Sequence, residues 1–335
     1  MTPADLQALT LRLRQHPGLR GKEEIQAPAR TFPPLPFPEL GPAAALGDDA
    51  ALIPGVTGPL LLASEGMDPQ LVDDDPWFAG WSGVLVNLSD IAAMGGNPLA
   101  VVNSLWATGE QHAERLLAGM RFASDTFAVP MVGGHTNLHS PYNALSVAVL
   151  GTTPGPVLSA RAARPGDRCH LLVNIKGHFH RHYPFWDAAT EAEPARLRRH
   201  LALLVELAGA RIVHGAKDIS MGGLVGTAVM FAEAAHCRLE LDLEALQPPG
   251  GVELEAWLTC FPSYGYLLAV DPSQSAALRH ATGIDPDLLC VEIGRFQSGD
   301  AELVLSAAGA CQRVWHQQDP LTGFGALNDL GQEHL

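Results

Sequence analysis

Hydrophobic runs alternate with polar, glycine-containing and proline-containing stretches along the chain, and this pattern predicts a regular succession of strands and helices. A short apolar run is typical of a buried strand, whereas apolar residues spaced three and four apart indicate a helix. In its first half the chain is predicted to form a helix within 1–22, extended chain over 23–46, a strand over 59–65, a helix over 76–95, a strand over 98–109, a helix over 110–127 and strands over 129–134 and 144–151.

A stretch rich in proline, glycine and alanine, residues 152–167, separates this half from a second set of elements and is the predicted domain boundary. The second half is predicted to form a strand over 168–175, a helix over 195–210, a helix that starts at a glycine pair within 219–232, and strands over 239–243, 263–270 and 290–296. Because strands and helices alternate in both halves, we expect two α+β or α/β domains of similar size.

The segment VNLSDIAAMGGNP, residues 86–98, places an asparagine and an aspartate in the middle of an apolar helix. Asn87 and Asp90 are three residues apart, so a helix presents both side chains on one face. The following glycine pair and Pro98 predict the end of this helix. An ionised aspartate is seldom buried without a partner. Two interpretations stay open, a solvated or capping aspartate on an amphipathic helix and a functional pair.

Composition and charge exclude several classes of function. With 335 residues, of which 47% are hydrophobic, the chain is long enough for two packed domains. Its net charge of −15 argues against a general nucleic-acid binder, although an acidic site suits phosphates that carry metal ions. Since no apolar run reaches the length of a membrane span and the N-terminus lacks a signal-peptide pattern, we expect a cytoplasmic protein without a membrane partner.

Carboxylates gather beside glycines and at the ends of predicted strands. Hard cations such as Mg²⁺ prefer oxygen ligands, and glycine turns let backbone N–H groups approach phosphates, so this pattern suits a metal–nucleotide site. Each of these acids taken alone is also explained as a turn or cap residue. The P-loop, G-x-G-x-x-G and H-R-D fingerprints are missing from the sequence. The acids in question are Asp48, Asp49, Glu65, Asp73, Asp74, Asp75, Asp90 and Asp218.

Five motifs in a fixed order carry a resemblance to a known superfamily. They are GDDAA, LVDDDPWFAGWSGVLVNLSDIAAMGGNP, VGGHTN, ARPGD and KDISMGGL. The chain resembles the aminoimidazole ribonucleotide (AIR) synthase-related, or PurM-like, superfamily over roughly residues 18–300. That superfamily includes AIR synthase, thiamine-monophosphate kinase, selenophosphate synthetase and a hydrogenase-maturation dehydratase. The pattern suits an AIR-synthase-related subgroup better than any of these enzymes.

The resemblance implies an α+β fold with two PurM-like domains and a cleft that binds ATP and Mg²⁺. The N-terminal domain would form a β-barrel across a homodimer, and the C-terminal domain would be an α/β sandwich. On this basis we expect an N-terminal arm over 1–40, an ATP-binding and dimerisation domain over 41–155, a C-terminal domain over 165–310 and a tail over 311–335.

The resemblance also assigns roles to individual residues. Asp49, Asp90 and Asp218 match metal-ligand aspartates, and Asp48 would be a ligand or a nucleotide contact. Asn87 lies beside the metal, and Glu65 stands where relatives usually have an aspartate. The phosphate-contacting segment matches Gly133, Gly134, His135 and Thr136. Imidazole is a poor ligand for Mg²⁺, so His135 is expected to contact phosphate.

Two departures bear on the chemistry. Lys22 matches the lysine of the N-terminal motif of selenophosphate synthetase and is a candidate for catalytic phosphate contact, or else a surface lysine. The stretch before it, Gly18–Gly21, has no thiol, which argues against selenide chemistry. Met221 stands where the thiamine-monophosphate kinases have a second aspartate, so one metal ligand is missing.

The stretch NIKGHFHRHYPFWD, residues 174–187, concentrates cations and aromatic rings. Lys176, His178, His180 and Arg181 are candidates for contact with an anionic substrate. The alternatives are zinc binding by the histidines and a polar loop without ligand.

These observations predict an enzyme that uses ATP and Mg²⁺ to phosphorylate or dehydrate a small molecule through a phosphorylated intermediate. A simple metabolite kinase of the thiamine-monophosphate kinase type is the alternative enzyme. A nucleotide-binding subunit without turnover, held in a complex with another protein, is the alternative from a different class.

Overall fold

The structure, a computed structural model, describes residues 1–20, 22, 51–55, 58–262 and 265–323. Contacts within the chain define two compact units. The smaller unit comprises residues 49–155 and 191–206, and the larger unit comprises residues 1–48, 156–190 and 207–335. Helix α7 (Pro194–Gly209) begins in the smaller unit and ends in the larger one.

A five-stranded sheet forms the frame of the smaller unit, in the order β1-β2-β5-β3-β4. Neighbouring strands are antiparallel except β3 and β4, which run parallel because α6 connects them. The strands are β1 (Ala51–Gly55), β2 (Gly58–Gly66), β3 (Asn97–Trp106), β4 (Met131–Asn137) and β5 (Ala144–Thr152).

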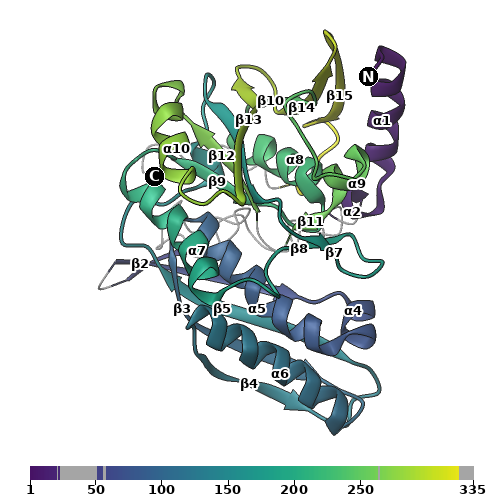
Figure 1. Ribbon diagram of the computed structural model, residues 1–335, viewed down its shortest axis with the longest axis vertical. Helices are drawn as coiled ribbons and strands as arrows, with labels where there is room; N and C mark the ends of the chain where they lie inside the picture. The colour runs from purple at the N-terminus through teal and green to yellow at the C-terminus, as the bar shows by residue number, and fades with distance from the viewer. Residues whose placement is uncertain (21, 23–50, 56–57, 263–264, 324–335) are drawn as a thin grey trace. The chain divides into compact units, whose positions relative to one another are not determined.

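Three helices accompany this sheet: α4 (Pro69–Asp74), α5 (Pro76–Ala93) and α6 (Glu110–Phe127) (Figure 1). Helix α5 packs directly on the sheet, where Ile91 fills the space beside Gly151 and Gly83 faces Leu145. Helix α6 packs in turn against α5. Helix α5 is therefore sandwiched between a sheet and a helix, which explains why nearly all its side chains are buried.

The opposite face of the same sheet is apolar but uncovered within the described chain. Side chains alternate between the two faces of a strand, so Leu62, Val102 and Leu150 lie opposite the α5 face. They are 45%, 40% and 37% exposed, respectively. An apolar sheet face of this kind is typical of a protein–protein contact.

A seven-stranded sheet forms the larger unit, in the order β15-β14-β10-β13-β6-β12-β9. Its strands are β6 (Arg168–Asn174), β9 (Gly215–Asp218), β10 (Arg238–Asp242), β12 (Gly265–Val270), β13 (Leu288–Gln297), β14 (Glu302–Ala307) and β15 (Ala310–His316). A small sheet beside it joins β7 (His178–Phe179), β8 (Phe185–Asp187) and β11 (Phe261–Pro262).

The helices of the larger unit include the chain's N-terminus. They are α1 (Pro3–Gln15), α2 (Pro17–Arg20), α8 (Gly223–Ala235), α9 (Leu254–Thr259) and α10 (Ser275–Thr282), with short 3₁₀ turns at Ala160–Ala162 and Pro272–Gln274. Leu6, Leu9 and Leu13 of α1 enter the same hydrophobic core as α8 and the sheet. The first twenty residues are thus part of a packed domain, whereas the sequence predicted a separate arm over 1–40.

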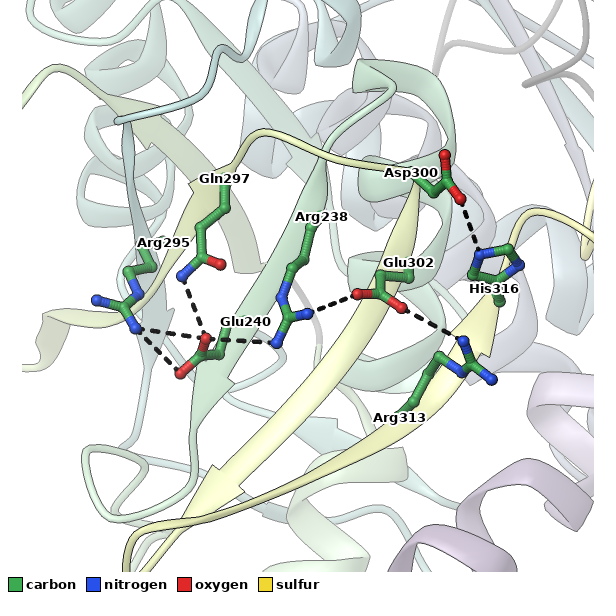
Figure 2. A network of polar contacts seen from close by, with 8 residues as sticks. All are labelled: Arg238, Glu240, Arg295, Gln297, Asp300, Glu302, Arg313 and His316. Atoms are coloured by element: carbon green, nitrogen blue, oxygen red, sulfur yellow. Dashed lines mark hydrogen bonds and ion pairs between the residues drawn. The ribbon is translucent and has the colours of Figure 1, made fainter.

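Strands β10, β13, β14 and β15 carry charged side chains on the sheet face that lies opposite the hydrophobic core (Figure 2). Glu302 pairs with Arg238 at 2.8 Å and with Arg313 at 3.7 Å. The Glu240 carboxylate accepts a hydrogen bond from the Gln297 Nε2 at 3.1 Å and lies 3.4 Å from the Arg295 guanidinium. Leu239 and Leu241, which alternate with these residues along β10, face the core. Each carboxylate is shared among several donors, so this surface is held by its own ion pairs.

Strand β15 corrects a second boundary. Residues 311–316, expected in the tail, pair with β14 as the edge strand of the sheet. In the described part of the chain, no helix has both the length and the hydropathy that a membrane span requires.

Candidate functional site

The polar pair of the opening segment lies in the buried centre of α5. Asn87 is 0% exposed and Asp90 is 5% exposed. The Asn87 Nδ2 donates to the Gly83 carbonyl at 2.8 Å, but its buried Oδ1 has no hydrogen-bond partner among the described residues. A solvated aspartate on an amphipathic surface helix is therefore wrong. The helix instead holds two oxygen-bearing side chains, one turn apart, in a buried position.

Glu65 lies on the sheet face that α5 covers. It pairs with Val147 across β5 and follows buried Leu61 and Ala63 in the alternating pattern, so all three point toward the helix side. Unlike those two residues, Glu65 is exposed. Glutamate is one methylene longer than the aspartate usual in relatives, and the Glu65 side chain reaches solvent at the rim of the α5 face.

The phosphate-contacting segment predicted at residues 133–136 lies on edge strand β4, in the register of Val102 to Leu105 on β3. All four residues are exposed. The ring of His135 lies 6.4 Å from that of Trp106, between centroids. The segment offers backbone groups and an imidazole to solvent along one edge of the smaller unit.

Asp218 ends strand β9 in the larger unit and is 6% exposed. The turn that follows is tightly bonded: the Ile219 N–H donates to Gly265, and the Ser220 N–H donates to the Thr227 hydroxyl. Met221 is 51% exposed at the tip of this turn. The turn delivers the chain into the first residues of α8, next to the carboxylate.

Gly223, the first residue of α8, fits only as glycine. Its φ is +65°, in the left-handed region, and an added Cβ would stand 2.5 Å from the Thr259 Cα. The start of α8 is thereby pressed against the end of α9. Because the N–H groups of a helix's first turn carry a partial positive charge, the turn after Asp218 favours an anion.

Lys22 is brought to the same turn by the N-terminal helices. Its Cε lies 3.6 Å from the position that a Cβ on Gly222 would take. Leu19 of α2 is 6% exposed and packs beside Gly226 of α8. The interpretation of Lys22 as a freely solvated surface lysine is therefore not supported, since the side chain is partly buried at the start of α8.

The 174–187 stretch forms a compact hairpin around strands β7 and β8. The rings of His182 and Tyr183 stack at 4.3 Å, and Tyr183 stacks on Phe185 at 5.4 Å. Lys176, His178 and Arg181 are exposed and His180 is half-buried. Within the ranges that the structure describes, no group of three or more His, Cys, Asp or Glu side chains has the arrangement of a metal site. The hairpin thus carries exposed basic side chains together with a stack of aromatic rings.

Two acids of the LVDDDP segment have structural tasks. The Asp75 carboxylate caps α5 by accepting the Phe78 N–H at 3.4 Å and lies 3.7 Å from Arg115. Asp73 accepts from the Asn143 amide at 2.7 Å. The interpretation as a cap acid is confirmed for Asp75, whereas Asp73 lies within α4 and holds the distant Asn143 side chain.

The predicted site residues thus fall into two sets. Glu65, Asn87, Asp90 and residues 133–136 belong to the smaller unit, and Lys22 and Asp218 belong to the larger one. Asp48 and Asp49 lie outside the described residues. The sequence did not point to Ser220, whose buried hydroxyl oxygen has no partner in the described chain. Its position two residues after Asp218, in a glycine-rich turn, is the signal that was available.

Comparison with known proteins identifies the family. The sequence pattern of the AIR synthase related protein N-terminal domain matches residues 47–153, and that of the AIR synthase related protein C-terminal domain matches residues 170–305. The chain therefore belongs to the AIR synthase-related family, as its motifs indicated.

Individual relatives agree with this assignment. The uncharacterized protein sll0787 of Synechocystis is 44% identical over 318 residues, which are 94% of this chain and 98% of that protein. A thiamine-monophosphate kinase of Caulobacter vibrioides is 29% identical over 288 residues, covering 76% of this chain and 78% of the kinase. The solved structure of AaThiL complexed with AMPPCP and TMP has a TM-score of 0.60 at 21% identity, covering 81% of this chain and 92% of that one. This likeness establishes the shared mixed α/β two-domain fold.

Proposed function

We propose that this protein is an ATP- and Mg²⁺-dependent enzyme that activates a small molecule through a phosphorylated intermediate. The observation that carries the proposal is the buried pair on α5, where Asp90 lies one turn from an Asn87 oxygen without a partner in the described chain. A buried orphaned oxygen lowers the stability of the fold unless a ligand completes its hydrogen bonds or coordination. The relatives of this chain include named kinases. One structural neighbour was solved as a complex with AMPPCP, an analogue of ATP.

The oxygen-bearing side chains of Glu65, Asn87 and Asp90 suit Mg²⁺ by their chemistry. This hard cation takes oxygen ligands, usually one or two carboxylates with phosphate oxygens and water. Asp90 with Glu65 would hold it in the smaller unit. Asp48, Asp49 and Asp218 stay proposed ligands because they match metal-ligand aspartates of the family. When bound, the metal neutralises phosphate charge and aligns an in-line displacement.

The phosphates would be held by groups other than carboxylates. Lys22 adds a positive charge to the anion-favouring turn before α8. The Gly133–Gly134 backbone, His135 and Thr136 supply donors along the exposed edge of β4. We assign the Lys22 ammonium to the transferred phosphate, where charge develops in the transition state.

Substrate selection would fall to the 174–187 hairpin. Lys176 and Arg181 supply positive charge, and His178 and His180 supply imidazoles, on the hairpin that also carries the ring stack of His182, Tyr183 and Phe185. Such a hairpin suits a substrate that carries an anionic group beside a flat ring or an apolar body. The thiamine-monophosphate kinase relative supports a metabolite kinase as the second candidate function.

A homodimer is part of the proposal. The uncovered apolar face of the five-stranded sheet, with Leu62, Val102 and Leu150, supports a β-barrel closed by a second copy. Sedimentation of the purified protein tests this independently of turnover.

The decisive experiment is isothermal titration with AMPPCP, with and without Mg²⁺, on the wild type and on Asp90→Asn. We expect Mg²⁺-dependent binding in the wild type and its loss in the variant, by about a hundredfold, because a ligand carboxylate is removed. Asp73→Asn is the matched control, since it makes the same chemical change at an acid that serves Asn143. Unchanged nucleotide affinity in folded Asp90→Asn would refute the site.

The same titration separates the remaining functions. If nucleotide binds, ADP release is measured with phosphorylatable metabolites and with small amides. Release coupled to a phosphorylated product identifies a kinase, and release coupled to loss of water identifies a dehydratase. Binding without release in any mixture favours a nucleotide-binding subunit of a complex.

A further inference from the structure

A pocket of about 660 Å³ lies in the smaller unit, between the C-terminal half of α6 and strands β3 and β4. This volume is in the range of small-molecule sites, which span roughly 300–1,000 Å³. Its described lining residues include none of those proposed to bind ATP, metal or substrate. The residues that matter for its chemistry are Asn103, Leu117, Met120, Ser124, Val129 and Met131.

The walls are largely apolar, and the charges beside them cancel. Leu117, Met120, Val129 and Met131 supply aliphatic and thioether surface, which suits a ring. Arg121 and Asp125 also line the pocket, 3.6 Å apart, with side chains 84% and 72% exposed. A pair of opposite charges gives a highly charged ligand no net attraction. The lining therefore favours a molecule that is neutral and largely apolar.

Two buried polar side chains in this apolar lining lack some of the hydrogen bonds that they can form within the described chain. Asn103 is 7% exposed, and its Oδ1 has no hydrogen-bond partner in the described chain. Its Nδ2 donates only to the Met131 sulfur, at 3.3 Å, and a thioether is a weak acceptor. Ser124 is 9% exposed, and its hydroxyl oxygen likewise has no partner among the described residues.

Met131 lies over the Asn103 amide and can uncover it. Its side chain is unbranched and rotates about three bonds, so it can leave the amide at small cost. A carboxamide group has one donor and one acceptor on the same edge, like the Asn103 amide itself. Two such edges form two hydrogen bonds at once, in which each N–H donates to the other's carbonyl.

We propose that this pocket binds an aromatic carboxamide. The ring lies against Leu117, Met120 and Val129, and the carboxamide replaces the Met131 sulfur at Asn103. The ligand N–H donates to Asn103 Oδ1, and the ligand carbonyl accepts from Asn103 Nδ2. The pocket adjoins the proposed phosphate-contacting segment, because Asn103 of β3 pairs with Gly134 of β4. Its test with a carboxamide needs neither ATP nor Mg²⁺.

The test uses benzamide as the probe and methyl benzoate as its matched control, because the two share ring and carbonyl but only benzamide has the N–H donors. Binding is measured on the full chain by saturation-transfer NMR and titration. For a probe this small we expect a dissociation constant on the order of 1 mM. Methyl benzoate should bind about tenfold more weakly, since it leaves the Asn103 oxygen unpaired.

Two variants locate the binding. Leu117→Trp fills the pocket at a residue 41% exposed, and Leu11→Trp makes the same change at a residue 52% exposed on α1. The first should abolish benzamide binding and the second should leave it unchanged, with both folds verified by thermal unfolding. Absence of benzamide binding, equal affinity for the two probes, or binding that survives Leu117→Trp would each overturn the proposal.

Discussion

Replacement of Gly223 by alanine should be among the most damaging small changes in the larger unit. The residue combines a φ of +65° with an added Cβ that would meet the Thr259 Cα at 2.5 Å, the Thr259 carbonyl carbon at 2.6 Å and the Leu258 oxygen at 2.7 Å. All three are backbone atoms, so rotation of a side chain cannot relieve the contacts. The first turn of α8 or the end of α9 has to move.

Two costs add up to the expected magnitude. A left-handed backbone costs a residue with a Cβ about 1–2 kcal/mol. Forcing one extra carbon into a packed site costs about 1–3 kcal/mol more. We expect Gly223→Ala to lower the free energy of unfolding by about 3 kcal/mol, which corresponds to a melting temperature about 6–12 °C lower for a unit of this size.

Gly226→Ala is the matched control, one turn further along the same helix. There an added Cβ meets only the Leu19 Cδ1, at 3.6 Å, an ordinary contact. Alanine in place of glycine inside a helix should stabilise the unit by about 0.5–1 kcal/mol. Urea unfolding of both variants measures the difference. A Gly223→Ala variant within about 1 kcal/mol of the wild type would refute the close approach of α8 and α9. Because Gly223 also sets the turn after Asp218, the variant should bind AMPPCP more weakly at temperatures where it is folded, whereas Gly226→Ala should not.

Three further predictions concern charged groups. Glu233→Gln should lower the free energy of unfolding by about 2 kcal/mol. The buried carboxylate accepts the Thr322 and Gly323 N–H groups at 3.2 Å each, whereas an amide cannot accept with both of its end atoms. An unchanged midpoint of urea unfolding would contradict this. Burial lowers the pKa of His170 below its ordinary value of 6.5, so the unfolded chain binds more protons and stability is lost as the pH falls below that value. His170→Leu should flatten this slope between pH 7.5 and 5.5 in unfolding titrations, and an equally steep slope in the variant would exclude His170 as its source. Glu302→Gln should lower the free energy of unfolding by only about 1 kcal/mol, because its arginine partners are 32% and 60% exposed. The difference in stability from the wild type should shrink in high salt. A difference that does not depend on salt would exclude an ionic origin.

Helices with a clear period were the most predictable part of the fold. Helix α6 was expected over 110–127 and is observed at Glu110–Phe127, because its apolar positions recur on one face and a glycine precedes it. The order of strands within each sheet was not available from the pattern. It depends on pairing between segments far apart in sequence, such as β6 with β13.

Strands β14 and β15 were missed for a local reason. They form a hairpin whose two-residue loop, Ala308 and Gly309, has φ values of +49° and +76°. Such turns usually carry Asn-Gly or Asp-Gly, and alanine at the first position conceals the signal. With no turn signal, the polar residues of β15 resemble a tail, although they form the solvent-facing side of an edge strand.

The sequence names the candidate aspartates but does not separate their local roles. Asp75 and Asp90 are the same residue type in one motif. The position of Asp75 directly before Pro76 is typical of a helix cap, and this part of the assignment follows from local rules. The burial of Asp90 depends on the sheet and helix that enclose α5, so only the assembled unit distinguishes the two aspartates.

The hydrogen bonds of their buried oxygens distinguish Glu233 from Asn87. Each oxygen of Glu233 accepts from the segment Thr322–Gly323, so its burial is explained by the fold alone. The Asn87 oxygen is equally buried but has no partner among the described residues, and a leucine of similar shape would spare the chain an orphan worth about 1–3 kcal/mol. A buried polar residue that lowers stability and forms no compensating contact in the fold is expected at a place where a bound ligand supplies the missing hydrogen bond. The same argument applies to Asn103 beside the α6 pocket, and it is why both asparagines, rather than the more numerous surface acids, define the places where this protein should be probed with ligands.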